Sequence, residues 1–298
     1  MKILLLGGNG QVGHELRRSL APVGEMVATT RSGALPDGSA CEALDLDALD
    51  TIAPLFEHIA PDVVVNATAH TAVDRAEEEP ELAFRANAEA PTRLAELCAA
   101  RNATLLHYST DYVFDGSGTR PYREDDPTAP LGVYGASKLA GEQGIAASGA
   151  RHLILRTAWV YATHGQNFLR TMLRVGAERE ELRVVADQRG SPTPAWLIAD
   201  VTAAILRQGV AESGIRHLVS TGETSWHGFA EAIFDEAHAR GLIARRPRVV
   251  PITTAEYPTR ARRPAYSVLD TERLQQEYGV ALPEWRTALQ RTLGGSAQ

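Results

Sequence analysis

The chain has 298 residues, of which 44% are hydrophobic and 22% are charged, and 37 acidic against 30 basic residues give a net charge of −7. This composition excludes an intrinsically disordered chain, and the negative charge argues against nucleic acid or an anionic membrane as the main partner. Two cysteines, Cys41 and Cys98, are too few for a disulfide framework or a four-thiolate zinc site. We therefore expect two buried thiols in a reducing compartment.

The N-terminal segment, Met1–Leu6, begins like a signal peptide, but glycines end its apolar run. No apolar run approaches the roughly 18–20 residues that cross a bilayer, so we expect a cytoplasmic protein. Only Lys2 and Lys138 are lysines, whereas the other 28 basic residues are arginines. This bias directs attention to Lys138, because arginine does not easily replace a compact ammonium.

The first 150 residues alternate apolar runs with helical patterns. The expected strands are Ile3–Leu6, Met26–Thr29, Val63–Asn66, Thr104–Tyr108 and His152–Arg156. The expected helices are Val12–Leu20, Ala48–Ile59, Pro80–Arg101 and one that starts near Tyr134 and runs past Glu142. The strands are continuously apolar, which is typical of sheets covered by helices on both faces. This order predicts an α/β fold with a doubly wound parallel sheet, and Gly116–Pro130 is expected to be a long surface loop.

The pattern loosens after residue 157. Further elements are expected at Ile198–Leu206, His217–Ser220, Phe229–Ala239, Val249–Ile252 and Glu284–Leu293, of which the second and fourth are strands. The segment Thr253–Ala265 contains prolines and three arginines. We expect the second half to form a smaller α/β lobe against the sheet.

Three glycines follow the first expected strand in the segment Gly7–Gly13, at positions 7, 10 and 13. Glycines permit a tight turn and a close approach of the backbone, and the N-terminus of the next helix then faces a pyrophosphate. A turn without a ligand is the alternative, but the position after the first strand favours a dinucleotide site. We therefore expect a Rossmann-like dinucleotide-binding domain over 1–157. Residues 158–298 are expected to form mainly a substrate-binding lobe, with some segments returning to the Rossmann core.

The end of the second strand bears on the choice of cofactor. A carboxylate there favours NAD, whereas a basic residue accommodates the 2′-phosphate of NADP. This chain has Thr30 and Arg31, which favours NADPH, although Arg31 could instead be a solvated surface residue. Asp45 and Leu46 follow the next short strand and are candidates to flank the adenine, but Asp45 could equally cap a helix.

Tyr134 and Lys138 are four residues apart on an expected helix, so they share one face. A ketone that receives a hydride becomes an alkoxide and needs a proton, which Tyr134 can supply. The ammonium of Lys138 would stabilise the remaining phenolate and bond the nicotinamide ribose. By chance this spacing usually marks a solvated helix face, but here it follows a dinucleotide loop. Thr110 follows a strand, and its hydroxyl can bond the substrate oxygen and Tyr134, or cap the following loop with Asp111.

Together these residues resemble the extended, nucleotide-sugar-modifying branch of the short-chain dehydrogenase/reductase superfamily. Within it the chain is most similar to the dTDP-4-dehydrorhamnose reductase family. The segments that carry the similarity are Gly7–Gly13, Asn66–Asp74, Ser109–Gly116, Tyr134–Glu142, Arg156–Tyr161, Asp187–Thr193, Arg263-Pro264, Ser267 and Leu269-Asp270. They span almost the whole chain in order, and as a set they are highly specific.

The resemblance implies reduction of dTDP-4-dehydro-β-L-rhamnose at C4, the last step of dTDP-L-rhamnose synthesis, with NADPH and possibly NADH. It implies that Tyr134 donates the proton, Thr110 holds the keto oxygen and Lys138 anchors the ribose. The further cofactor contacts that it implies are Gly10, Gln11, Val12, Gly13, Ala69, His70, Thr71 and Tyr108. Asp111 and Trp159 match substrate-contacting positions, although Trp159 and His70 could instead be packing residues.

The substrate diphosphate needs cations, and Arg260, Arg262 and Arg263 are candidates, with Arg260 and Arg263 preferred; a solvated basic loop is the alternative. Some relatives form a magnesium-linked dimer through acidic side chains. Glu15 matches one of these, but Trp196 stands where another acid would be needed. We therefore expect no metal and a monomer or a metal-independent homodimer.

Two other functions remain open from the sequence. A dehydratase of the same branch usually carries a glutamate after the Thr-Asp pair, where this chain has Tyr112, and an epimerase would keep NAD bound. A non-catalytic regulatory subunit could also keep this fold, because function resides in the site and not in the fold. The intact set of Thr110, Tyr134 and Lys138 favours the reductase.

Overall fold

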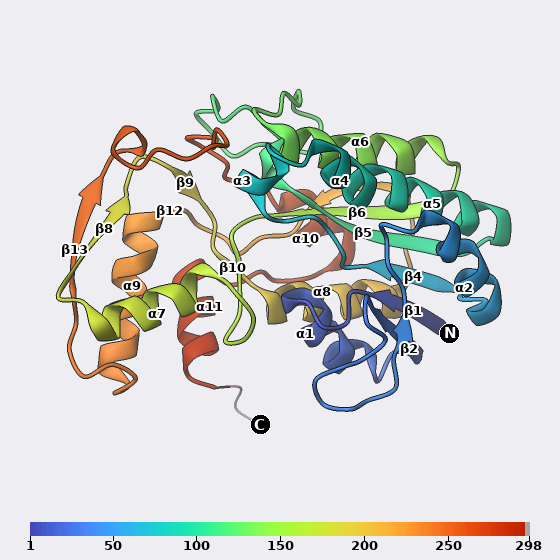
Figure 1. Cartoon of the computed structure of the whole chain (residues 1–298), viewed down its shortest axis with the longest axis horizontal. Helices are drawn as coiled ribbons and strands as arrows, with labels where there is room; N and C mark the ends of the chain where they lie inside the picture. The colour runs from blue at the N-terminus through green and yellow to red at the C-terminus, as the bar shows by residue number, and fades with distance from the viewer. Residues whose placement is uncertain (296–298) are drawn as a thin grey trace.

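Seven parallel strands form the central sheet of the computed structural model, which describes residues 1–295 (Figure 1). In chain order they are β1 (Lys2–Leu6), β2 (Glu25–Thr30), β3 (Glu42–Ala43), β4 (Val63–Asn66), β5 (Thr104–Thr110), β6 (Arg151–Thr157) and β11 (Gly214–His217). Their spatial order is β11-β6-β5-β4-β1-β2-β3, so the strand order reverses between β1 and β4. The predicted α/β class and the doubly wound parallel sheet are confirmed.

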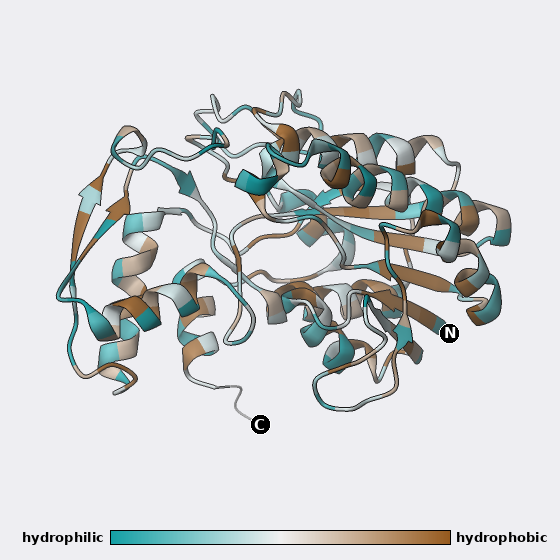
Figure 2. Cartoon of the chain, viewed as in Figure 1, coloured by the Kyte–Doolittle hydropathy of each residue, from teal (hydrophilic) through white to brown (hydrophobic). Residues whose placement is uncertain are grey.

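Helices cover both faces of this sheet. They are α1 (Gln11–Leu20), α2 (Ile52–Ile59), α3 (Val73–Ala76), α4 (Pro80–Phe84), α5 (Ala90–Arg101), α6 (Val133–Ala147), α8 (Ala195–Gln208) and α10 (Glu272–Tyr278), with the short turns η1 (Leu49–Thr51) and η3 (Asp111–Val113). Leu16 of α1 and Ile198 of α8 belong to the apolar cluster on one face, and Phe56 of α2 and Leu94 of α5 belong to the cluster on the other. Both sides of the central strands β1 and β4 are therefore buried, which explains why their residues are mainly hydrophobic, brown in Figure 2.

The expected single helix Pro80–Arg101 is interrupted by a π-helical segment, η2 (Arg85–Glu89), between α4 and α5. Pro91 has no backbone N–H with which to bond the carbonyl of Asn87 four residues earlier, so the α-helical hydrogen bonds cannot continue unchanged. The Asn87 carbonyl lies close to α6, where a Cβ atom on Gly141 would come within 2.1 Å of its oxygen. The prediction of one uninterrupted helix is thus corrected.

A smaller lobe lies at one end of the sheet (Figure 1). Its elements are β7 (Val160–Tyr161), α7 (Phe168–Glu178), β8 (Glu181–Val185), β9 (Arg189–Gly190), β10 (Thr193–Pro194), β12 (Thr224–Ser225), α9 (Trp226–Ala239), β13 (Arg248–Ile252), η4 (Thr254–Glu256) and α11 (Trp285–Leu293). Strands β8 and β13 pair in parallel. Phe229, Phe234 and Leu289 belong to a separate apolar cluster that holds this lobe together.

The second half is divided between this lobe and the main sheet. Helix α8 packs on α1, and β11 pairs with β6 at the edge of the sheet. The strand expected at His217–Ser220 begins earlier, at Gly214, whereas α8, α9, α11 and β13 lie within a few residues of their predicted positions. Helices α7 and α10 and strand β8 were not predicted. Residues 296–298 of the expected lobe lie outside the described residues.

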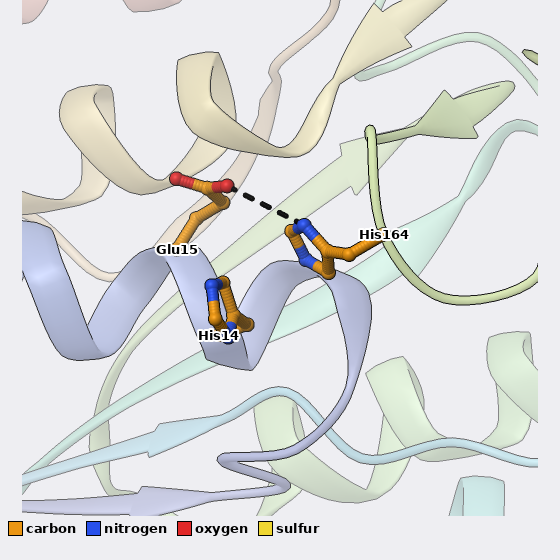
Figure 3. Close-up of side chains that lie close together, drawn as sticks. All are labelled: His14, Glu15 and His164. Carbon is orange, nitrogen blue, oxygen red and sulfur yellow. Dashed lines mark ion pairs between the residues drawn. The ribbon is translucent and has the colours of Figure 1, made fainter. Parts of the chain in front are cut away.

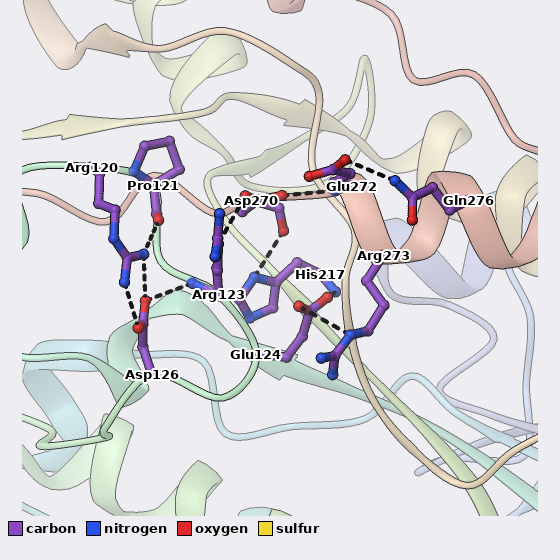
Figure 4. A network of polar contacts seen from close by, with 10 residues as sticks. All are labelled: Arg120, Pro121, Arg123, Glu124, Asp126, His217, Asp270, Glu272, Arg273 and Gln276. Atoms are coloured by element: carbon purple, nitrogen blue, oxygen red, sulfur yellow. Dashed lines mark hydrogen bonds and ion pairs between the residues drawn. The ribbon is translucent and has the colours of Figure 1, made fainter.

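The expected loop Gly116–Pro130 contains no helix and is fixed to the C-terminal part of the chain (Figure 4). The Tyr122 N–H donates to the Val268 carbonyl at 2.8 Å, and a carboxylate oxygen of Glu124 accepts from the His217 N–H at 3.1 Å. These bonds keep the loop against the sheet without secondary structure of its own. Among the helices of residues 1–295, none is long and apolar enough to cross a membrane.

Candidate active site

A cavity of about 880 Å³ lies at the carboxyl ends of the central strands and is lined by residues from both parts of the chain. The predicted site residues in its lining are Gly7, Gly10, Gln11, Val12, Thr30, Arg31, Leu46, Ala69, Thr71, Tyr108, Thr110, Asp111, Tyr134, Lys138, Trp159 and Arg263. Four others, Gly13, Asp45, His70 and Arg260, lie outside this lining. The structure thus brings together most of the residues that are scattered along the sequence.

The glycine loop joins β1 to α1 and lines the cavity. Gly10 is the N-cap of α1, and among the described residues no side chain bonds to this helix end and no acid lies in its first turn. The N–H groups of the first turn and the positive end of the helix dipole therefore suit a pyrophosphate. Gly13 has a packing role, because a Cβ atom there would lie 2.0 Å from the Gly7 carbonyl oxygen. These features fit a dinucleotide.

The end of β2 carries no carboxylate. Arg31 follows it, with 75% of its side chain exposed, and its guanidinium lies 3.4 Å from Asp45 and 3.7 Å from Asp47. Asp47 lines the cavity, whereas Asp45 accepts a hydrogen bond from the Asp47 N–H at 3.1 Å. Asp47 was not predicted, because no sequence pattern indicates the turn that places its side chain at the cavity.

Tyr134 and Lys138 lie on one face of α6, as their spacing predicts, and both line the cavity. The Lys138 ammonium group is buried, with Nζ donating to the Tyr108 carbonyl at 2.6 Å. Burial lowers the pKa of Lys138 to about 8, although the Glu142 carboxylate acts in the opposite direction. Burial raises the pKa of Tyr134 to about 12, whereas a hydrogen bond with Thr110 lowers it. The phenol is thus protonated at neutral pH and poised to donate.

Thr110 ends β5 beside these two residues. Its hydroxyl donates to the Asp111 carboxylate at 3.0 Å and accepts from the Tyr112 N–H at 3.2 Å, so it also caps η3. Thr110 therefore has the capping contacts that the sequence offered as one alternative, and it also lines the cavity. Burial raises the pKa of Asp111 to about 6, and hydrogen bonds from Ser267 and Thr110 oppose this shift.

Two stacked indoles also line the cavity. The rings of Trp159 and Trp226 are 3.5 Å apart between centroids and nearly parallel, at 3°. Trp159 has a φ of 48°, in the left-handed region that costs a residue other than glycine about 1 kcal/mol or more. Strain of this kind is typical of functional sites. Trp226 was not predicted, because it comes from α9 in the smaller lobe and no local pattern links it to the site.

The three candidate arginines have different surroundings. Arg263 lines the cavity and donates to the Asp74 carboxylate at 2.7 Å. Arg260 instead forms an ion pair with Glu78 and is largely exposed, as is Arg262. Of the three, Arg263 is therefore the one in position to meet a ligand in the cavity.

Glu15, the acid that the sequence singled out for a bridging cation, faces His14 and His164 (Figure 3). Their nearest ligand atoms all lie within 4.8 Å of one another. Trp196, the departure from the expected acidic pattern, donates its indole N–H to the Thr292 hydroxyl at 2.9 Å. Glu15 thus has neighbours other than the carboxylates of a shared magnesium site.

The doubly wound sheet, the glycine loop and the Tyr134–Lys138 pair in one cavity define an extended short-chain dehydrogenase/reductase. A sequence model of the RmlD substrate binding domain matches residues 1–297. The dTDP-4-dehydrorhamnose reductase of Burkholderia thailandensis is 49% identical over 300 residues, covering 97% of both chains. This chain therefore belongs to the dTDP-4-dehydrorhamnose reductase family.

Solved structures agree. A crystal structure of a dTDP-4-dehydrorhamnose reductase from Clostridium acetobutylicum is 36% identical, has a TM-score of 0.89 and covers 99% of both chains. The reductase of Bacillus anthracis, whose crystal structure is a complex with NADP, is 33% identical, with a TM-score of 0.88 and 98% of both chains covered.

Proposed function

We propose that this chain reduces the C4 keto group of dTDP-4-dehydro-β-L-rhamnose to give dTDP-L-rhamnose, the last step of dTDP-rhamnose synthesis, with NADPH as the reductant. The observation that carries the proposal is the convergence of Thr110, Tyr134 and Lys138 on the cavity that begins at the glycine loop, in a chain of this family. NADPH supplies the hydride that is added to C4.

The side chains of this site provide the proton. Tyr134 donates its phenolic proton to the keto oxygen as negative charge develops there. Thr110 helps to hold that oxygen, and the charged form of Lys138 stabilises the phenolate that remains. Because Lys138 is buried and Tyr134 is partly buried on the same helix, neither group has to be ordered during the reaction.

We assign the cofactor to the sheet end of the cavity. Its proposed contacts are Gly7, Gly10, Gln11, Val12, Thr30, Arg31, Leu46, Ala69, Thr71, Tyr108, Tyr134 and Lys138. The proposed substrate contacts are Thr110, Asp111, Tyr134, Trp159 and Arg263. In this assignment residues 1–157 bind the dinucleotide and most of the remainder binds the sugar nucleotide. Gly13 and His70 support the cofactor site through packing, and Arg260 has no assigned contact.

The decisive experiment follows the absorbance of NADPH in the presence of freshly generated dTDP-4-dehydro-L-rhamnose, and repeats the assay with NADH. Substrate-dependent oxidation, with dTDP-L-rhamnose as the product, supports the proposal. Folded protein that binds NADPH but turns over neither cofactor would contradict it and favour a regulatory role or another nucleotide sugar.

Arg31→Ala is expected to weaken NADPH binding by about tenfold or more and to change NADH binding little. The reason is that only NADPH carries the 2′-phosphate that a guanidinium can bond, and such charged hydrogen bonds contribute about 1.5–3 kcal/mol. Titration of both cofactors against the variant and the unmodified chain measures the difference. Equal losses for the two cofactors would show that Arg31 does not contact the phosphate.

We also propose that the chain is a monomer or a homodimer held without metal. Sedimentation is expected to give the same mass with and without EDTA, because a bridging magnesium ion needs several oxygen ligands and Trp196 stands where a second acid would be required. A dimer that EDTA dissociates would refute this.

Cys98 is buried as expected, whereas Cys41 is partly exposed, which corrects the expectation of two buried thiols. Both thiols are free, which is consistent with a cytoplasmic location. We propose that location because it also suits an enzyme that draws on NADPH.

A further inference from the structure

A chain of buried polar groups runs beneath Lys138. Asn66 ends β4, His107 is its direct neighbour in β5, and all three side chains are at most 1% exposed. Asn66 Nδ2 lies 3.1 Å from His107 Nδ1, and His107 Nε2 lies 3.1 Å from Lys138 Nζ. The proposed reaction uses Lys138 but gives Asn66 and His107 no role.

The direction of these hydrogen bonds is fixed at the Asn66 end. The Thr68 N–H donates to Asn66 Oδ1 at 3.1 Å, and the Thr68 hydroxyl bonds the same atom. A backbone N–H only donates, so the atom that faces it must be the amide oxygen. The amide NH₂ therefore faces the imidazole, and His107 Nδ1 must accept. The ring proton of neutral His107 then resides on Nε2.

This tautomer places an N–H group against Lys138 Nζ. A charged ammonium has three N–H donors and no acceptor, so one of its N–H groups would face the N–H of His107. The neutral amine has a lone pair that can accept the hydrogen bond from His107. Burial also disfavours the charge, and His107 itself stays neutral because burial and Lys138 lower its pKa. Glu142 acts in the opposite direction on Lys138, but its carboxylate is bonded to Arg156 at 2.6 Å.

Two titratable tyrosines complete the surroundings of Lys138. Tyr108 offers Lys138 only its backbone carbonyl, since its hydroxyl bonds Thr202 at 2.7 Å, and Tyr134 lies one turn earlier on α6. Burial keeps both phenols protonated, because it raises their pKa values. The contact that distinguishes the two forms of Lys138 is therefore the one with His107.

We propose that Asn66 and His107 are positioning residues that control whether Lys138 carries its proton, by presenting the His107 Nε2–H to the lysine nitrogen. The inference rests on the proposed role of Lys138 in the reduction. The charged lysine stabilises the Tyr134 phenolate, so the pair sets the alkaline pH at which reduction fails. The network therefore lets Lys138 gain and lose its proton near neutral pH, instead of keeping the side chain permanently charged.

The chain offers a direct test, because it has only two lysines. In protein labelled with ¹³C at lysine Cε, the signal of Lys2 serves as the internal reference. In the Lys2→Arg variant the only lysine signal is that of Lys138, which assigns it. We expect Lys138 to titrate about two pH units or more below Lys2, as buried lysines can. Titration of the two lysines at the same pH in the unmodified, cofactor-free chain would overturn the proposal.

Asn66→Asp reverses the polarity of the network. The new carboxylate keeps the bond from Thr68 and accepts from His107 Nδ1, so His107 Nε2 becomes an acceptor for the ammonium. We expect the Lys138 titration and the alkaline limb of kcat/KM to move up together by about one pH unit or more. His107→Phe removes the opposing N–H without adding charge, and a smaller upward movement is expected.

The double variant Asn66→Asp/His107→Phe separates the tautomer from simple charge attraction. If the aspartate acts through His107, the double variant titrates like His107→Phe alone. A full Asn66→Asp shift in the double variant, or no shift in either single variant, would overturn the proposal. Because the lysine titration needs no turnover, it stands apart from the activity assay, which tests the proposed function.

Discussion

Tyr134→Phe is expected to lower kcat by about 10²–10⁴-fold and to leave NADPH binding nearly unchanged. The substitution removes the proton donor but keeps the ring that packs edge-on against Tyr112, with centroids 5.6 Å apart. Lys138 keeps its bond to the Tyr108 carbonyl at 2.6 Å, so its proposed contact with the ribose is preserved. Turnover follows from nicotinamide oxidation, and cofactor affinity from quenching of tryptophan fluorescence.

Tyr112→Phe is the matched control. It makes the same chemical change on the neighbouring ring of the cavity. We expect less than about a tenfold loss, since Tyr112 lies in η3, two residues after Thr110, and is not the partner of Lys138 on α6. A near-normal rate for Tyr134→Phe would remove that residue from its assigned role. Equal losses in both variants would mean that the two hydroxyls act as one unit.

Arg156→Leu is expected to reduce the free energy of unfolding by about 3–5 kcal/mol. Arg156 and Glu142 form an ion pair in which 2% and 3% of the side chains are exposed, joined by two hydrogen bonds at 2.6 and 2.9 Å. Removing the guanidinium leaves a carboxylate buried without its partner, which is costly in a low-dielectric interior. Urea unfolding followed by circular dichroism measures the loss.

The double variant Arg156→Leu/Glu142→Leu is expected to recover much of that stability, because an apolar pair of similar volume avoids the desolvation of both charges. Recovery would show that the loss arises from the unpaired carboxylate. A single variant within about 1 kcal/mol of the unmodified chain would show that water or another donor reaches Glu142.

The sequence predicted those parts of the fold that depend on local patterns. The strands β1 and β4 are mainly runs of buried aliphatic residues, and Glu284 caps α11 as expected for a helix that starts there. The π-helical segment η2 was missed because it results from Pro91 and from the close approach of α6, which no hydrophobic period reports. Asn167 could have predicted the start of helix α7, because its side chain caps that helix by accepting a hydrogen bond from the Arg170 N–H.

The sequence predicted the candidate site residues that lie close together on one helix. It missed those that only tertiary packing brings to the site. Tyr134 and Lys138 are one helical turn apart, so their meeting follows from secondary structure alone. Trp226 and His107 reach the site only through the sheet register and the contact between the two parts of the chain. Arg260 and Arg263 are equivalent in the sequence, and only their partners, Glu78 and Asp74, distinguish them.

Strand β11 completes one edge of the central sheet, but it is synthesised long after the strand β6 that it covers. Because β11 and α8 come from the second half of the chain, residues 1–157 released alone would leave β6 as an open edge and the apolar side of α1 uncovered. Such a fragment offers other chains a template for strand addition. We therefore expect that residues 1–157 do not fold on their own, and that a nascent chain must extend past His217 before β6 and α1 are covered.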